Sequence, residues 1–77
     1  MKHYVDMLVR VDVNGRMRPL RFLWDNGKEY KIDRILSVCK ASSLKEGREG
    51  LRYTCQICNK VRFLYYEGER WFVECDQ

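Results

Sequence analysis

The sequence has one histidine, one proline and no long run of apolar residues. A membrane-spanning helix needs about 18 or more consecutive apolar residues, so we expect none and no membrane partner. The first eight residues lack both the apolar stretch and the small-residue cleavage site of a signal peptide. These absences predict a cytoplasmic protein, in which the four cysteines stay reduced.

Patterns of catalytic chemistry are also missing. His3 is the single histidine and lies near a terminus, so a Ser-His-Asp or Cys-His arrangement has no well-placed base. Residues 47–50, with the sequence GREG, match neither the phosphate-binding loop nor the dinucleotide-binding pattern. The acidic residues lie mostly at expected turns or on the solvent side of expected strands, where their pKa values are not tuned for acid–base catalysis. We therefore expect no enzyme, no cofactor and no small-molecule substrate.

The length and charge indicate a small binding module. A chain of 77 residues forms one domain, here residues 1–77, and buries only about 60–65% of its unfolded surface, so no deep cleft is expected. Lys and Arg number 15 against 11 Asp and Glu, a net charge of +4. Four of the acidic residues fall within residues 67–77, so the rest of the chain is strongly basic. This balance is compatible with a nucleic-acid or acidic partner, and also with simple solubility.

The first half of the chain alternates between apolar and polar residues as β-strands do. Residues 3–13 show this period of two, and Asn14-Gly15 follows, which predicts a hairpin with a two-residue type I′ turn. The return strand, residues 17–24, contains Pro19, which donates no ladder hydrogen bond and so predicts an edge strand or a bulge.

A third strand is expected over residues 28–39, after a turn at residues 25–27. Ile35 and Leu36 are adjacent apolar residues that interrupt its alternation, which predicts a β-bulge or a bend. Residues 40–50 are polar and glycine-containing, which predicts one longer loop with room for a single helical turn over residues 43–46.

Residues 51–75 contain three more alternating runs, separated by turns near Asn59 and at residues 67–69. The predicted fold is therefore all-β: an antiparallel meander of five to six short strands. In a short chain such a meander protects its edges best by curling, so we expect a small barrel of the SH3-like or a similar type.

Cys55 and Cys58 have the spacing of half a zinc knuckle. A closed zinc site needs two more ligands, and the remaining cysteines, Cys39 and Cys75, are single. Metal binding and redox chemistry of the pair stay open. The interpretation that we prefer is that of buried or incidental thiols, because Cys55 shares its parity with the expected core residues.

Basic residues interleaved with aromatic ones are typical of small barrels that bind single-stranded nucleic acid, in which cations contact phosphates and rings stack on bases. Ring candidates, by their expected outward parity, are Tyr66, Phe72 and Tyr4, of which Tyr66 is preferred. The candidate phosphate contacts are Arg16, Arg18, Arg21, Lys45, Arg48 and Arg52.

Two alternatives stand beside nucleic-acid binding. The cations can form an ordinary solvated face that keeps strand edges apart. The domain can also bind a protein, along an edge strand that begins near Pro19 or through an exposed Trp24 or Trp71.

Several segments together resemble a known group. The pattern W-x-x-G-x-x-Y-x-I-D-R-I-L begins at Trp24, and the later run Y-x-x-x-x-x-W-F-V-E ends at Glu74. This combination resembles small uncharacterised bacterial proteins found mainly among Clostridia, similar to short domains that occur alongside Y-family translesion DNA polymerases. The resemblance implies a β-rich helper in DNA damage tolerance or replication, with a DNA-repair protein as a further potential partner, and it supplies no catalytic residues.

Overall fold

The computed structural model describes residues 2–42 and 49–74, which form seven β-strands in one antiparallel sheet. The strands pair in the order β3-β2-β1-β7-β6-β5-β4. Their bounds are β1 Lys2–Val11, β2 Met17–Leu23, β3 Glu29–Lys31, β4 Arg34–Ser42, β5 Glu49–Ile57, β6 Lys60–Glu67 and β7 Arg70–Glu74.

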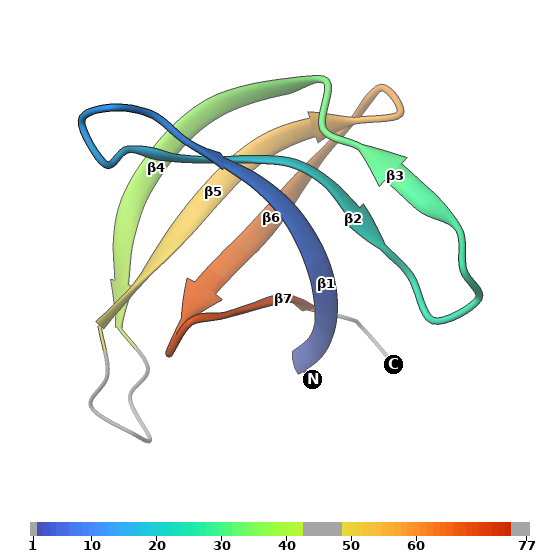
Figure 1. Cartoon of the computed structure of the whole chain (residues 1–77). Helices are drawn as coiled ribbons and strands as arrows, with labels where there is room; N and C mark the ends of the chain where they lie inside the picture. Colours follow the sequence, from blue (N-terminus) through green and yellow to red (C-terminus); the bar gives the residue numbers. More distant parts are fainter. Residues whose placement is uncertain (1, 43–48, 75–77) are drawn as a thin grey trace.

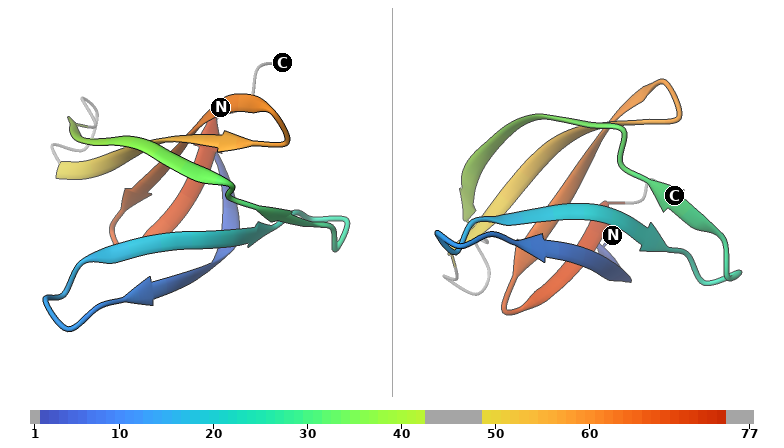
Figure 2. Two further views of the ribbon diagram at one scale, coloured as in Figure 1. Left: turned by 90° about the horizontal axis from the view of Figure 1, so that it is seen from above. Right: turned by 45° about the horizontal axis from the view of Figure 1, so that its top comes forward.

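The sheet curls into a half-barrel that stays open on one side (Figures 1 and 2). The predicted all-β meander curled toward a small barrel is thereby confirmed. Within the described part of the chain there is no helix long and apolar enough to cross a membrane.

The strand count differs from the prediction because the expected third strand divides into β3 and β4. At Ile32 the backbone N–H donates to the carbonyl oxygen of Leu20 at 2.9 Å. At Asp33 it donates instead to the carbonyl oxygen of Gln56, also at 2.9 Å. These two residues carry the chain from one edge of the sheet to the other (Figure 1). The predicted bulge is confirmed by a register shift between Ile35 and Ser37. The division of the strand lies earlier than the interruption at Ile35 and Leu36 suggested, at Ile32 and Asp33.

The loop expected over residues 40–50 is shorter than predicted. Lys40 pairs with Leu51 and Ala41 with Gly50, so the β4–β5 ladder continues well into that segment. Ala and Gly have small or no side chains, and Gly50 packs so closely that an added Cβ would lie 2.8 Å from the carbonyl oxygen of Tyr66. The helical turn expected over residues 43–46 lies outside the described residues.

The first hairpin forms as predicted, but its turn is of another type. The N–H of Gly15 donates to the carbonyl oxygen of Asp12 at 3.0 Å, which makes Val13 and Asn14 the turn corners. Within this turn only Gly15 has a positive φ, of 80°, whereas a type I′ turn needs two such residues. The Asp12 carboxylate stabilises this turn, because it accepts hydrogen bonds from the N–H groups of Asn14 and Arg16, both at 2.9 Å.

The two-residue turn with two positive φ angles occurs instead between β5 and β6. Cys58 has a φ of 52° and Asn59 a φ of 63°, and the flanking Ile57 and Lys60 pair with each other. Both angles lie in the left-handed region that a type I′ turn requires. The turn near Asn59 is thus confirmed, with an ordinary cysteine at a backbone position that favours glycine.

Pro19 lies beside a bulge, as predicted, but β2 is not an edge strand. The register between β1 and β2 shifts at Leu8/Val9, directly before the Val9–Pro19 pair. On its other side β2 pairs with β3 through residues 21–23 only. Pro19 therefore has no partner in β3, so its missing N–H removes no hydrogen bond between β2 and β3.

The core lies on the inner, concave face of the sheet. Cys55 and Leu64 have exposed fractions of 0% and 1%, and the Tyr53 hydroxyl donates to the carbonyl oxygen of Met17 at 3.2 Å. That hydrogen bond ties the β1–β2 hairpin to the β4–β7 half of the sheet. The buried core cluster consists of Phe22, Ile32, Tyr53, Cys55, Ile57, Leu64 and Trp71.

Candidate nucleic-acid interface

The outer face of β1, β2 and β3 carries a basic strip, which we define as Arg10, Arg16, Arg18, Arg21 and Lys31. All five residues are exposed. Four of them lie at register positions of the three strands, and Arg16 lies in the turn that joins β1 to β2.

The alternation of the strands directs these cations outward. Pro19 and Phe22 of β2 are buried, so their neighbours Arg18 and Arg21 point to the other face. Across the ladder, Arg10 lies directly opposite Arg18. Directly opposed residues in an antiparallel pair have Cβ atoms about 4.5–5.5 Å apart, so two guanidinium groups share one small area.

Acidic side chains neutralise only part of this strip. The Nη1 atom of Arg21 lies 2.8 Å from the Oε1 atom of Glu29, and both side chains are 49% exposed. The Asp12 carboxylate is occupied by backbone N–H groups of its own turn. Among the described residues, no acidic group forms an ion pair with the remaining four cations, Arg10, Arg16, Arg18 and Lys31.

Three of the phosphate-contact candidates predicted from the sequence, Arg16, Arg18 and Arg21, lie together in the basic strip. Arg52 does not, because β6, β7 and β1 separate its strand β5 from β2 in the sheet. The Arg52 guanidinium lies over the Phe63 ring instead, at 5.2 Å from its centroid. Lys45 and Arg48 lie outside the described residues.

The predicted orientation of Tyr66 is wrong. Its ring is half-buried on the inner face, packs against the core cluster and lies 5.0 Å from the Trp71 ring. Leu64 is the buried residue of β6, so Tyr66, two positions later, shares its face. The Tyr66 ring is therefore not a stacking platform on the outer face.

The other two ring candidates do lie on the outer face. Phe72 is only 4% exposed, because its ring stacks on Tyr65 at 4.9 Å and meets the edge of Tyr4 at 5.5 Å. Tyr4 is 41% exposed, but the Arg70 guanidinium covers its face at 4.1 Å. The Phe72 ring is therefore inaccessible, and one face of the Tyr4 ring is already occupied.

We compared the chain with known proteins. No protein-family model, curated protein or solved structure matches it. The likeness to bacterial domains near translesion polymerases therefore stays a prediction.

The Cys55–Cys58 pair is divided between the core and the surface. Cys55 is fully buried, and burial raises the pKa of its thiol to about 11, which holds the sulfur in the protonated form that binds metal poorly. Cys58 is exposed in the turn, where its backbone N–H donates to the Asp33 carboxylate at 3.2 Å. The described residues contain no group of three or more His, Cys, Asp or Glu side chains that could hold a metal ion.

The surfaces expected for a protein partner also differ from the prediction. Trp71 is 6% exposed and belongs to the core, and Trp24 is half-buried. The edges of the sheet are β3 and β4 rather than the strand that contains Pro19.

Arg10 and Lys31 are not among the phosphate contacts predicted from the sequence, although Lys31 belongs to the basic residues of the second hairpin. Arg10 lies on the polar side of the β1 alternation, which is a usable signal for its exposure. Its position opposite Arg18, however, depends on the bulge beside Pro19, which shifts the register by one residue. Local alternation carries no information about such a shift.

Proposed function

We propose that this domain is a non-catalytic module that binds nucleic acid through the basic strip. The observation that carries the proposal is the direct opposition of Arg10 and Arg18, with no acidic partner for either among the described residues. Like charges directly opposite each other destabilise a sheet. A bound phosphate between them removes that repulsion and accepts hydrogen bonds from both guanidinium groups.

The shape of the strip suits a polyanion with repeated charges. Arg16 at the turn and Lys31 on β3 extend the row of cations beyond the central pair, so a phosphate backbone could follow the outer face of the hairpin. Contacts of this kind attract nucleic acid of any sequence and position it, without distinguishing bases. A role as an accessory to DNA repair or replication fits both this chemistry and the resemblance noted above.

The test is the salt dependence of binding to a fluorescein-labelled 12-nucleotide dT strand. The variant replaces the central pair, Arg10→Gln with Arg18→Gln. A charge-matched control, Arg34→Gln with Lys40→Gln, removes two exposed cations from β4 instead. Each phosphate that is no longer neutralised reduces the magnitude of the slope of log K against log salt by about 0.7 for a single strand. The strip variant, which loses the phosphate shared by Arg10 and Arg18, should therefore lose about 0.7.

An unchanged slope in the strip variant would overturn the proposal. An equal loss in both variants would also count against it, since the effect would then follow net charge rather than this surface. In that case capture from a nuclease-treated lysate tests the competing hypothesis of a protein partner, because a protein remains bound when nucleic acid has been digested.

A further inference from the structure

The open side of the half-barrel forms a cleft that is separate from the basic strip. Its volume is about 650 Å³, within the range of small-molecule sites. The length of the chain predicts no deep cleft, but β3 and β4 do not pair, so the inner face of the sheet remains accessible between its two halves. Residues of β2, β3, β5, β6 and β7 line it.

Aromatic rings form one wall of this cleft. The Tyr30 ring stacks on Phe22 with centroids 5.2 Å apart, and Phe22 meets the edge of Trp24 at 6.5 Å. His3 stacks on Trp24 at 4.2 Å and so covers one face of the indole. Trp24 and Tyr30 are half-buried, which leaves part of each ring accessible from the cleft.

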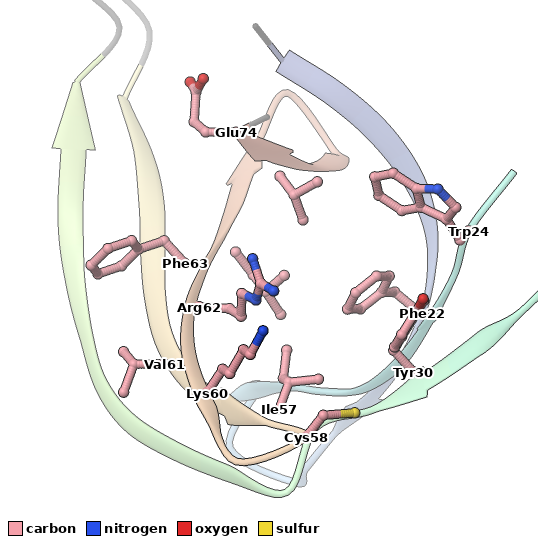
Figure 3. A pocket seen from close by; sticks show the side chains of 12 residues that line it. Phe22, Trp24, Tyr30, Ile57, Cys58, Lys60, Val61, Arg62, Phe63 and Glu74 are labelled. Carbon is pink, nitrogen blue, oxygen red and sulfur yellow. The ribbon is translucent and has the colours of Figure 1, made fainter. Parts of the chain in front are cut away.

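Two cations form the opposite wall. Figure 3 shows Lys60 and Arg62 extending from β6 into the cleft, with the rings of Phe22, Trp24 and Tyr30 on the other side. Lys60 and Arg62 are two positions apart on one face of a strand, so their Cα atoms are about 7 Å apart. In the described part of the chain, neither side chain has a hydrogen-bond or ion-pair partner.

The position of these cations is unusual for a β-strand. They share the inner face with Leu64, which is buried, and pair across the ladder with the core residues Ile57 and Cys55. Both side chains are exposed, so a ligand in the cleft can reach their charges directly. Glu74 lies at the end of the cleft away from Lys60, which gives the cleft one cationic and one acidic end (Figure 3).

We propose that this cleft binds one unpaired nucleotide, with its base against the Trp24–Phe22–Tyr30 wall and its phosphate on Lys60 and Arg62. A base offers a π-face for stacking, and a phosphate offers oxygen atoms that accept charge-assisted hydrogen bonds. Inorganic phosphate would leave the rings unused, and a neutral aromatic compound would leave the cations unused. A base inside a duplex has both faces covered, so the ligand is a free nucleoside phosphate or a nucleotide of a single strand.

The experiment follows amide and indole N–H shifts of the isotope-labelled protein during titration with five probes: AMP, adenosine, inorganic phosphate, the octanucleotide dA8 and an 8-base-pair duplex. AMP should shift the Trp24 indole and the amides of residues 57–64, and adenosine and phosphate should each bind more weakly than AMP. In the Arg10→Gln/Arg18→Gln variant, which lacks the central pair of the basic strip, a tighter complex with dA8 than with AMP would identify a strand as the source of the nucleotide. Equal affinities would identify the free nucleotide.

Variants locate the site. Arg62→Gln should weaken AMP binding about tenfold or more, the loss expected for a hydrogen bond to a charged group. Lys40→Gln, at an exposed position on β4 outside both surfaces, removes the same charge elsewhere and should leave AMP binding unchanged. Trp24→Leu should also weaken it about fivefold or more through lost stacking. Trp24 and Tyr30 both pack against the core, so thermal denaturation of each variant checks that it is folded, and Tyr30→Leu provides a second test of the ring wall.

The inference is overturned if neither AMP nor dA8 moves the cleft resonances, or if Arg62→Gln binds AMP like the parent protein. It is also overturned if phosphate or adenosine alone binds as tightly as AMP. The Arg10→Gln/Arg18→Gln variant separates it from the proposed function, because that variant should weaken binding of long strands but not of AMP. If this variant still binds long strands like the parent protein, the basic strip was assigned wrongly. If it loses AMP binding, the cleft was assigned wrongly.

Discussion

Cys58 shows how a single side chain can be at odds with its backbone. Its φ of 52° lies in the left-handed region, which is costly for a residue with a Cβ atom. We predict that Cys58→Gly raises the free energy of unfolding by about 0.5–1 kcal/mol, measured by urea denaturation. Cys39→Gly, at an exposed position within β4, should lower it by a similar amount. A Cys58→Gly protein that is less stable than the parent would contradict this account.

Cys55 should make stability depend on pH in the alkaline range. Burial raises its pKa from 9.0 to about 11, so the unfolded chain loses this proton first as the pH rises. Between about pH 9 and pH 11 the unfolded state binds fewer protons, and the free energy of unfolding falls by up to about 2–3 kcal/mol.

The measurement is a series of urea denaturation curves from pH 7 to pH 11. Cys55→Ala should be less stable at pH 7, because it leaves a cavity in the core, but its stability should fall less steeply above pH 9. Parallel curves for the two proteins would show that another group is responsible for the alkaline loss.

Among the elements, the β4–β5–β6 ladders depend on Gly50. A Cβ at this position would lie 2.8 Å from the carbonyl oxygen of Tyr66, a backbone atom that cannot turn away. Gly50→Ala should therefore lower the free energy of unfolding by about 1–3 kcal/mol, measured by thermal or urea denaturation.

Gly27 offers a control for that substitution. Nothing lies within 4 Å of a Cβ built at Gly27, and its φ of 84° is one that Asn tolerates better than other residues. Gly27→Asn should cost clearly less than Gly50→Ala. If the two substitutions cost the same, the close approach of Gly50 to β6 is not what limits this position.

As a whole, the molecule consists of two sheet halves with unequal shares of the core. Most of the buried residues belong to β5, β6 and β7, whereas β2 contributes Phe22 and Pro19. The halves are joined by the four β1–β7 pairs and by the hydrogen bond from Tyr53 to Met17. We expect the β1–β2 hairpin to open more easily than the β5–β6 ladder.

Native-state hydrogen exchange tests this order. Amides of residues 17–23 should exchange at a lower opening free energy than those of residues 51–57. Tyr53→Phe removes the hydroxyl donor and should cost about 1 kcal/mol, with the greatest loss of protection in the hairpin. Equal loss of protection throughout the sheet would show that the domain opens as a single unit instead.

The candidate surfaces differ in how far sequence alone predicts them. Arg16, Arg18 and Arg21 are predicted because they are cations interleaved with apolar residues. Alternation places Arg21 opposite to Phe22, whereas Arg18 shares the outer face only because of the bulge next to Pro19. Lys60 and Arg62 are not predicted as site residues, because the usual expectation that polar residues face solvent and apolar ones the core fails on β6. There the apolar Val61 and Phe63 are 59% and 46% exposed, and the two cations share the inner face. A shift of one residue reverses every side chain of a strand, and only the pairing with β5 decides it.

The sequence by itself determined the class of fold and most turns, because alternation and turn residues act over a few neighbours. The carboxylate of Asp12 and the glycine at position 15 shape the first turn without help from the rest of the chain. The tertiary structure alone decided where the third strand divides, since the amide of Asp33 finds its acceptor on Gln56, far along the sequence. There the chain crosses from one edge of the sheet to the other, and the curvature of the open half-barrel places Lys60 and Arg62 opposite the rings of β2 and β3.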